Sequence, residues 1–434
     1  MLPYKQIAYI VDSQTADVGQ AIFTKGAMKM KKRLVSLFLV LVLILSSAMS
    51  VNASSRNREP VGNENVGLNN RENSLRLPVI APSDDVVVLA EQNLVQQREV
   101  LMYIPDVFGF TSSELANMQL GAPFSIYVFG ENRVLSDEEV LVFPLLYNNN
   151  IIGILETFYD EALNQWFFTF GRSYADELNA LQQSSYTNRD FVIGRIGDIL
   201  FASNGEDATV IFNRELEDQL CITVSEMNYL ISSVEARAYL DFADITVPIT
   251  EEVLKISDIS ESAEIMSANN FRLLSVRHVP QTGVCGVAAW AAILNFRFPT
   301  SANYTNASLA RAMYNAGFRA ATPSMTNYRD YSNLIYNANA VWNSSPLNIT
   351  QVRNLIDLNR PMMGSWGRTV NGELSLHAVN IIGYEVVSSA NMTFYFVRNP
   401  WHTHIQSLTV NHSSPTHVVY IDGSFVWTLR QTVH

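Results

Sequence analysis

The sequence contains little cysteine and, after its first 53 residues, almost no lysine. Its two cysteines, Cys221 and Cys285, allow at most one disulfide. Lys255 is the only lysine after residue 53, and the arginines of residues 271–434 form no cluster along the chain. Nucleic-acid-binding proteins concentrate basic side chains in a patch or stripe. We therefore expect no nucleic-acid partner.

Two common catalytic motifs are also missing. The chain has neither an H-E-x-x-H zinc motif nor a G-x-S-x-G nucleophile motif. These absences argue against a zinc peptidase of the first type and a serine hydrolase of the second. We expect neither a metal nor a cofactor.

Charge is distributed unevenly along the chain. Residues 54–270 carry a net charge of −22, whereas residues 271–434 carry +6. The chain is longer than one hydrophobic core usually needs, so at least two structural units are expected. Units of opposite charge attract one another. The acidic part is predicted to dock on the basic part, less tightly as salt rises.

The first 53 residues have the pattern of an export signal. In residues 28–53 a basic start precedes an apolar run at 34–45, and Val51 and Ala53 are spaced as signal peptidase requires. The run is short for a membrane span, so we expect a cleaved signal, with an N-terminal anchor as the alternative. Residues 1–27 are an upstream extension. The mature protein is predicted to be secreted, extracellular and not stably bound to a membrane.

The rest of the chain divides into four segments. Residues 54–84 are polar and rich in Asn, as in a disordered leader. Residues 85–249 are rich in β-forming residues. Residues 250–270 are acidic and rich in Ser, and we interpret them as an exposed linker that proteases can cut. Residues 271–434 form the last segment.

Segment 85–249 is predicted to be mostly strand. β-rich runs flank residues 148–150 and 204–205, which are turn signals for antiparallel hairpins. Apolar spacing predicts helices at 173–183 and 225–240. An antiparallel sheet or partial barrel with one or two helices is expected.

Segment 271–434 is predicted to begin with helices and end with strands. The helices are expected at 285–297, at 306–317 with Ser308 as its cap and Gly317 as its end, and at 349–359. Five strands follow, at 376–387, 392–399, 405–410, 417–421 and 425–429. Helices followed by an antiparallel sheet indicate an α+β fold.

Cys285 lies in the first turn of the predicted helix 285–297, after a polar loop. The free N–H groups and the dipole at a helix N-terminus favour an anion. A thiol there is expected to have a lowered pKa and to be more nucleophilic. Residues 287–294 have no polar side chain, so the helix should be buried all round and hold the thiol rigidly. An inert buried cysteine is the alternative.

A nucleophilic cysteine needs a base, and His377 is the candidate. It opens one strand of a predicted hairpin, and Asn399 ends the other strand. Each of the two residues is 11 positions from Ser388, in the predicted turn at 388–391, so their side chains should meet across the hairpin. The Asn carbonyl would then fix the imidazole so that its other nitrogen faces the thiol.

Two further residues complete the predicted site. Gln281 lies one short loop before Cys285, and its side-chain amide and the Cys285 N–H can converge on an oxyanion. Trp401 follows Asn399 closely and can shield the His–Asn hydrogen bond from water. Each feature is weak alone, and the order Gln, Cys, His, Asn is what makes the combination specific.

These residues resemble a papain-like cysteine peptidase, most closely the small secreted bacterial staphopain type. The matching stretches are "QTGVCGVAAWAAILN", "LHAVNIIGYE" and "VRNPW", and the resemblance covers about residues 271–434. It implies a two-lobe catalytic domain, with a helical lobe and an antiparallel β-barrel-like lobe, after a β-rich prodomain. It assigns Cys285 as nucleophile, His377 as base, Asn399 as orienting residue and Gln281 as oxyanion donor.

The resemblance also implies an inactive precursor. The chain would be a monomeric zymogen that acts on protein or peptide substrates. Its own residues 85–249 would be the intramolecular inhibitor, and activation would cut within the linker 250–270. Two departures from the family are visible: Gln281 lies four residues before Cys285 instead of six, and the neighbours of Cys285 differ from the usual pattern.

Two other functions remain open from the residues. A transglutaminase or another acyl-transfer enzyme can use the same three groups, because an acyl-enzyme can pass to an amine as well as to water. A non-enzymatic secreted binding protein held by a Cys221–Cys285 disulfide is the third hypothesis. Within the peptidase class, the export signal argues against an enzyme that trims leader peptides during transport.

Overall fold

The computed structural model describes eleven stretches of the chain. These are residues 76–78, 84–128, 140–183, 190–196, 199–204, 208–213, 246–248, 271–370, 373–388, 391–423 and 425–434. All of them belong to one compact unit. The predicted export signal, the helix at 225–240, the linker at 250–270 and Cys221 lie outside the described residues.

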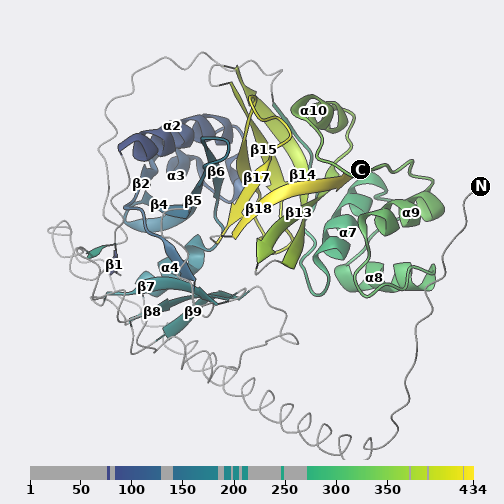
Figure 1. Ribbon diagram of the computed structural model, residues 1–434, viewed down its shortest axis with the longest axis horizontal. Coiled ribbons are helices and arrows are strands. Elements are labelled where there is room, and N and C mark those ends of the chain that lie inside the picture. The colour runs from purple at the N-terminus through teal and green to yellow at the C-terminus, as the bar shows by residue number, and fades with distance from the viewer. Residues whose placement is uncertain are drawn as a thin grey trace, which may run out of the picture. The chain divides into compact units, whose positions relative to one another are not determined.

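A large antiparallel sheet and seven α-helices make up most of the described chain, which is a mixed α+β arrangement (Figure 1). The sheet runs in the order β12 (Trp342–Asn343), β18 (Phe425–Val433), β13 (Met362–Val370), β14 (Glu373–Val387), β15 (Met392–Arg398), β16 (Gln406–Asn411), β6 (Gln165–Gly171), β5 (Asn150–Asp160), β4 (Val140–Tyr147) and β2 (Gln119–Leu120). Two more strands join it: β11 (Phe271–Leu273) pairs with β14, and β17 (Val419–Asp422) pairs with β18.

One apolar helix anchors the helical part of residues 271–434. Helix α7 (Cys285–Arg297) has the predicted bounds, and its residues from Gly286 to Leu294 are all buried. The side-chain amide of Asn380, on β14, donates a hydrogen bond of 2.8 Å to the carbonyl of Ala289. This bond and the apolar contacts around it fix α7 against the sheet.

Three further helices follow α7 along the chain, and each begins with a capping box. They are α8 (Asn306–Asn315), α9 (Met325–Tyr336) and α10 (Ile349–Asp357). The prediction that Ser308 caps α8 is wrong by three residues. Thr305 is the N-cap, and Ser308 is the third helical residue, whose hydroxyl accepts a hydrogen bond from the Thr305 N–H. Gly317 has a φ of +98°, which agrees with its predicted role at the helix end.

The N-terminal part contains more helix than the sequence predicts. Helix α2 (Asp84–Leu101), the 3₁₀ turn at Pro105–Phe108 and helix α3 (Ser112–Asn117) lie in a segment that was predicted to be mostly strand. Helix α4 (Ala175–Gln182) was predicted. Among the described residues, no helix is both long enough and apolar enough to span a membrane.

Hairpin turns in the N-terminal part lie where the Asn signals predict them. Strands β4 and β5 meet at Asn148 and Asn149, which have φ angles of +50° and +60°. These left-handed values suit Asn and the twist of a tight hairpin. A second sheet has the order β3 (Ile126–Val128), β7 (Val192–Ile196), β8 (Ile199–Ser203) and β9 (Ala208–Asn213). Strands β1 (Arg76–Pro78) and β10 (Thr246–Pro248) form a separate antiparallel pair.

The large sheet joins the two halves of the described chain. Strand β16 of the C-terminal half pairs with β6 of the N-terminal half, with Ser407 opposite Phe170 and Leu408 opposite Thr169. The larger hydrophobic core also contains side chains from both halves. The segments predicted as separate units therefore share a sheet and a core.

Candidate active site

Cys285 is the first residue of α7, and the loop before it is tightly packed. The carbonyl of Val284, the N-cap residue, accepts a hydrogen bond of 2.9 Å from the buried side chain of Asn306. A Cβ at Gly283 would lie 2.8 Å from the Asn306 side-chain oxygen, so only glycine fits there without movement. The loop and α8 together fix the helix end that carries the half-buried cysteine.

The Cys285 thiol does not have the lowered pKa that its position predicts. Burial raises the pKa of the thiol, and this effect outweighs hydrogen bonding from the backbone N–H groups of Ala378, Gly286 and Cys285, which lowers it. The backbone N–H groups at the helix end therefore lower the thiol pKa, as expected, but the loss of surrounding water raises it by more. Ala378, whose backbone N–H lowers the pKa of the thiol, is the residue that follows His377.

His377 and Asn399 are in hydrogen-bond contact. His377 lies on β14, opposite Trp366 of β13, and its Nε2 is 3.0 Å from Oδ1 of Asn399. Both side chains are buried. Because an amide oxygen only accepts, Nε2 of His377 carries the proton and donates it. In this tautomer Nδ1 carries no proton and has the lone pair of an acceptor.

The strand register that produces this contact differs from the predicted one. Asn380, not His377, marks the last strand pair of the β14–β15 hairpin, where it lies opposite Arg398. A bulge between Ile381 and Gly383 shifts the register. Asn399 follows the end of β15, and its side chain reaches the His377 ring from there.

Trp401 covers the His377 ring, as the sequence predicted. The two rings stack with centroids 3.6 Å apart and planes 10° apart. The Trp401 N–H donates to Oδ1 of Asn399 at 3.0 Å, so the same amide oxygen holds both residues. Trp427 adds a third ring, 5.5 Å from His377. This aromatic group limits the access of water to the His–Asn hydrogen bond.

Gln281 lies beside the Asn399 turn. Its backbone N–H donates to the carbonyl of Pro400 at 3.2 Å, and Nε2 of His278 lies 3.1 Å from the same carbonyl. The Gln281 side-chain oxygen is buried and has no hydrogen-bond partner. The structure thus joins the Gln281 loop to the turn that carries Asn399.

Sequence analysis missed a set of buried polar residues behind Asn399. They are Tyr420 and Asp422 of β17, His402 of the turn and Gln406 of β16. Their strands were predicted, but no spacing rule marks polar side chains that meet from separate strands. The single usable signal was Asp422, one of five acidic residues in a segment of net positive charge.

Residues of the N-terminal half contact this site directly. Phe212 stacks on His402 with centroids 5.4 Å apart, and the Arg195 guanidinium lies 3.7 Å from the centre of the Phe425 ring. Phe425 in turn contacts Trp427, with centroids 6.0 Å apart. The N-terminal half therefore packs against both the polar and the aromatic surroundings of His377.

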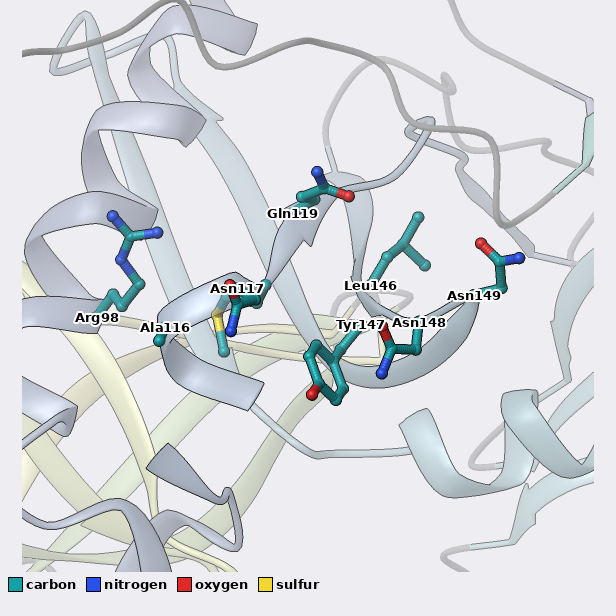
Figure 2. A pocket seen from close by; sticks show the side chains of 9 residues that line it. Arg98, Ala116, Asn117, Gln119, Leu146, Tyr147, Asn148 and Asn149 are labelled. Atoms are coloured by element: carbon teal, nitrogen blue, oxygen red, sulfur yellow. The ribbon is translucent and has the colours of Figure 1, made fainter. Parts of the chain in front are cut away.

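One cavity in the described chain lies away from these residues. It has a volume of about 670 Å³ and is lined by Arg98, the end of α3 and the β4–β5 turn (Figure 2). Its polar lining consists mainly of Asn117, Gln119 and the turn residues Asn148 and Asn149. None of the predicted site residues lines this cavity, and it has no His, Cys, Asp or Glu that could act as a nucleophile or base.

Metal and disulfide chemistry find no support among the residues that the structure describes. Within them, no group of three or more His, Cys, Asp or Glu side chains is arranged to hold a metal ion. Cys285 is a free thiol there. Cys221, its partner in the third hypothesis, lies outside the described residues.

Comparison with known proteins does not assign the chain to a family. No protein-family model matches the sequence, and no curated protein matches it.

Proposed function

We propose that this chain is the precursor of a secreted cysteine endopeptidase with a papain-like, two-lobe catalytic domain in residues 271–434. The observation that carries the proposal is the buried His377–Asn399 hydrogen bond under Trp401, with the Cys285 thiol next to Ala378. A thiol at a helix end, an imidazole on the residue before Ala378 and an orienting amide are the parts of a thiol nucleophile and its base.

The reaction follows from the protonation states. The thiol is protonated at rest because burial raises its pKa. On substrate binding, Nδ1 of His377 takes the thiol proton while the sulfur attacks the peptide carbonyl carbon. The C–N bond then breaks, and His377 gives its proton to the leaving amine. In the second half, His377 takes a proton from water and the hydroxide attacks the thioester carbon. The C–S bond then breaks, the carboxylic acid leaves, and His377 returns its proton to the sulfur to regenerate the thiol.

The oxyanion of each tetrahedral intermediate needs hydrogen-bond donors. We assign this role to the Cys285 N–H and the Gln281 side-chain amide. The Gln281 backbone is fixed to Pro400, and its side-chain oxygen has no partner that would hold the amide elsewhere.

We also propose that the N-terminal half keeps the precursor inactive. Phe212 and Arg195 contact the surroundings of His377, and β6 pairs with β16. Cleavage within residues 250–275 would release an active fragment of about the last 160 residues. Sequencing the N-terminus of secreted protein from culture fluid, and comparing the activity of precursor and fragment, tests this. A precursor as active as the fragment would contradict it.

The central test is labelling with an epoxide inhibitor that reacts with activated thiols. We expect modification at Cys285 in the unmodified precursor and slow labelling in His377→Ala. His412→Ala is the matched control, because His412 is bonded to Thr393 at 2.9 Å and has no contact with the site. Equal labelling of Cys285 in the His377→Ala and unmodified proteins would contradict the proposal.

Hydrolysis must also be separated from acyl transfer. A labelled peptide substrate should yield free acid when the processed protein acts in the presence of a primary amine. Mass spectrometry of the products distinguishes the acid from the amide. Predominant amide product would assign the site to an acyl-transfer enzyme.

A further inference from the structure

A buried carboxylate lies directly behind the Asn399 amide. The amide nitrogen of Asn399 donates to Oδ2 of Asp422 at 3.2 Å and to the hydroxyl of Tyr420 at 2.7 Å. All three side chains are fully buried. The nitrogen side of Asn399 therefore faces two oxygen acceptors, and its oxygen side faces His377.

This arrangement determines which way the amide is turned. The two ends of an Asn amide are nearly equal in size, so packing alone does not choose between them. A carboxylate only accepts, and the Tyr420 hydroxyl gives its proton to Gln406 Oε1 at 2.6 Å, which leaves its lone pairs for Asn399. A flipped amide would place its carbonyl against the Asp422 carboxylate, which is repulsive.

His402 holds the carboxylate in place. Its Nε2 lies 3.0 and 3.1 Å from the two oxygens of Asp422, and both residues are buried. Buried carboxylates persist when they are paired and hydrogen-bonded. The backbone N–H of His402 also donates to the carbonyl of Asn399 at 3.2 Å, so one short turn carries both Asn399 and the partner of Asp422.

We propose that Asp422, held by His402, is a positioning residue for the proposed peptidase reaction. Its carboxylate keeps the Asn399 oxygen turned toward His377, and that oxygen keeps the imidazole proton on Nε2. Nδ1 then carries no proton of its own and can receive the thiol proton of Cys285. The inference rests on the proposed function for its chemical consequence, but the orientation itself can be measured without any peptide substrate.

The first measurement needs no substitution. Nuclear magnetic resonance of the full-length chain, with ¹⁵N in its histidine rings, reports the tautomer of His377 at neutral pH. We expect the Nε2–H form, and the resonance is assigned by its loss in His377→Ala. The Nδ1–H form in the unmodified protein would overturn the proposal, whatever any variant does.

The second measurement uses Asp422→Asn in the full-length chain. In the unmodified chain, the carboxylate oxygens of Asp422 accept hydrogen bonds from Asn399 and His402. The isosteric change replaces one of these oxygens with an amide nitrogen, which donates. We expect His377 to populate the Nδ1–H form. Alkylation of Cys285 by iodoacetamide should slow roughly tenfold at pH 7, equivalent to about one pKa unit. At pH 10 the two rates should converge, because the thiol then ionises without the help of His377.

The matched control is Asp357→Asn. Asp357 accepts a hydrogen bond of 2.8 Å from the Tyr384 hydroxyl, has no contact with Asn399 and undergoes the same chemical change. It should leave the His377 tautomer and the alkylation profile unchanged. A merely structural role for Asp422 predicts equal effects at the two positions, or loss of reactivity at every pH. Either result overturns the proposal.

The outcomes separate this inference from the proposed function. If the tautomer and alkylation results are as expected but processed protein cleaves no peptide, the proposed function fails and the positioning role stands. If peptides are cleaved but Asp422→Asn behaves as the unmodified protein does, the positioning role fails and the proposed function stands. If Asp422→Asn does not fold, the tautomer of His377 in the unmodified chain decides whether the positioning role stands.

Discussion

The rings of His377 and Trp401 stack face to face, with their centroids 3.6 Å apart and their planes 10° apart. Trp401 also donates its backbone N–H to the Asn399 oxygen that binds His377. The tryptophan thus contacts both partners of the hydrogen bond it covers. Its role is therefore open to a direct test.

Replacing Trp401 with alanine should lower kcat/KM for peptide cleavage about tenfold, because water then competes for the His–Asn hydrogen bond and the stacking of about 1 kcal/mol is lost. Trp401→Phe should retain more activity than Trp401→Ala. The control is Trp342→Phe, on β12, whose indole N–H bonds Gln431 at 3.3 Å. Full activity of Trp401→Ala in processed protein would contradict the shielding role.

Gly286 and Tyr328 should behave as a coupled pair. A Cβ at Gly286 would lie 2.5 Å from the Tyr328 hydroxyl, which is buried and has no hydrogen-bond partner. Gly286→Ala should therefore destabilise the chain by about 1–3 kcal/mol through overpacking. Tyr328→Phe alone should be neutral or stabilising, because it removes an unpaired buried hydroxyl.

The double substitution tests the coupling. Gly286→Ala in a Tyr328→Phe background should cost less than in the unmodified chain, since the oxygen is gone and the ring carbon at 3.1 Å remains. Urea unfolding of the four proteins gives the interaction energy. Additive effects would show that the two positions do not clash.

Glu385 should make stability depend on pH. It is buried, one of its oxygens has no partner, and burial, with Glu99 nearby, raises its pKa to about 8. The ordinary value is 4.5. The folded chain therefore binds a proton that the unfolded chain releases above pH 4.5. Stability should fall as pH rises from about 4.5 to about 8, by an amount on the order of 5 kcal/mol.

Glu385→Gln isolates this effect. The neutral amide cannot ionise, so the variant should lose the decline in that pH range and exceed the unmodified chain in stability at pH 8. Urea unfolding of the full-length chain at pH 5 and pH 8 checks it. An unchanged difference between the two pH values would refute the assignment to Glu385.

Thr169 should help to hold the N-terminal half on the candidate site. Its buried hydroxyl accepts a hydrogen bond of 3.0 Å from the N–H of Ile421, between Tyr420 and Asp422. Thr169→Val removes the acceptor with little change of shape and leaves a buried N–H unpaired, which costs about 1–3 kcal/mol. In the proposed precursor, Cys285 should then label faster with the epoxide.

Thr157→Val is the control for this prediction. Thr157 is also buried, and its hydroxyl bonds the carbonyl of Leu141 at 3.3 Å within the N-terminal half. The Thr157→Val variant should lose a similar amount of stability, but its Cys285 should not be labelled faster. Equal labelling rates in the two variants would argue against a specific role for Thr169.

The parts of the fold that were predicted correctly are those with strong local sequence signals. The wholly apolar run after Cys285 predicted α7 to the residue, and the Asn pair at 148–149 predicted the β4–β5 turn. Helix α2 was missed because its apolar face is interrupted by Asn93 and Gln97, which are buried although polar. Strand β13 was missed because Gly364 and Gly367 weaken its pattern, although Trp366 lies at its centre.

In the candidate site, too, some features were predicted from local sequence and others were missed. Order along the chain and a hairpin argument brought His377 and Asn399 together, even though the bulge at Ile381–Gly383 changed the register. The pKa of Cys285 was predicted in the wrong direction, because a sequence shows a helix end but not how much water the fold removes from it. Asp422 and Tyr420 depend on the packing of β17, which no local pattern encodes.

The pairing of β16 with β6 has a consequence for any fragment released from this chain. The pairing joins Ser407 and Leu408 to Phe170 and Thr169, so removal of β6 leaves backbone donors and acceptors of β16 without their strand partner. Open strand edges recruit other strands. A liberated fragment should therefore self-associate through β16 unless its concentration stays low. Size-exclusion chromatography over a dilution series would reveal this.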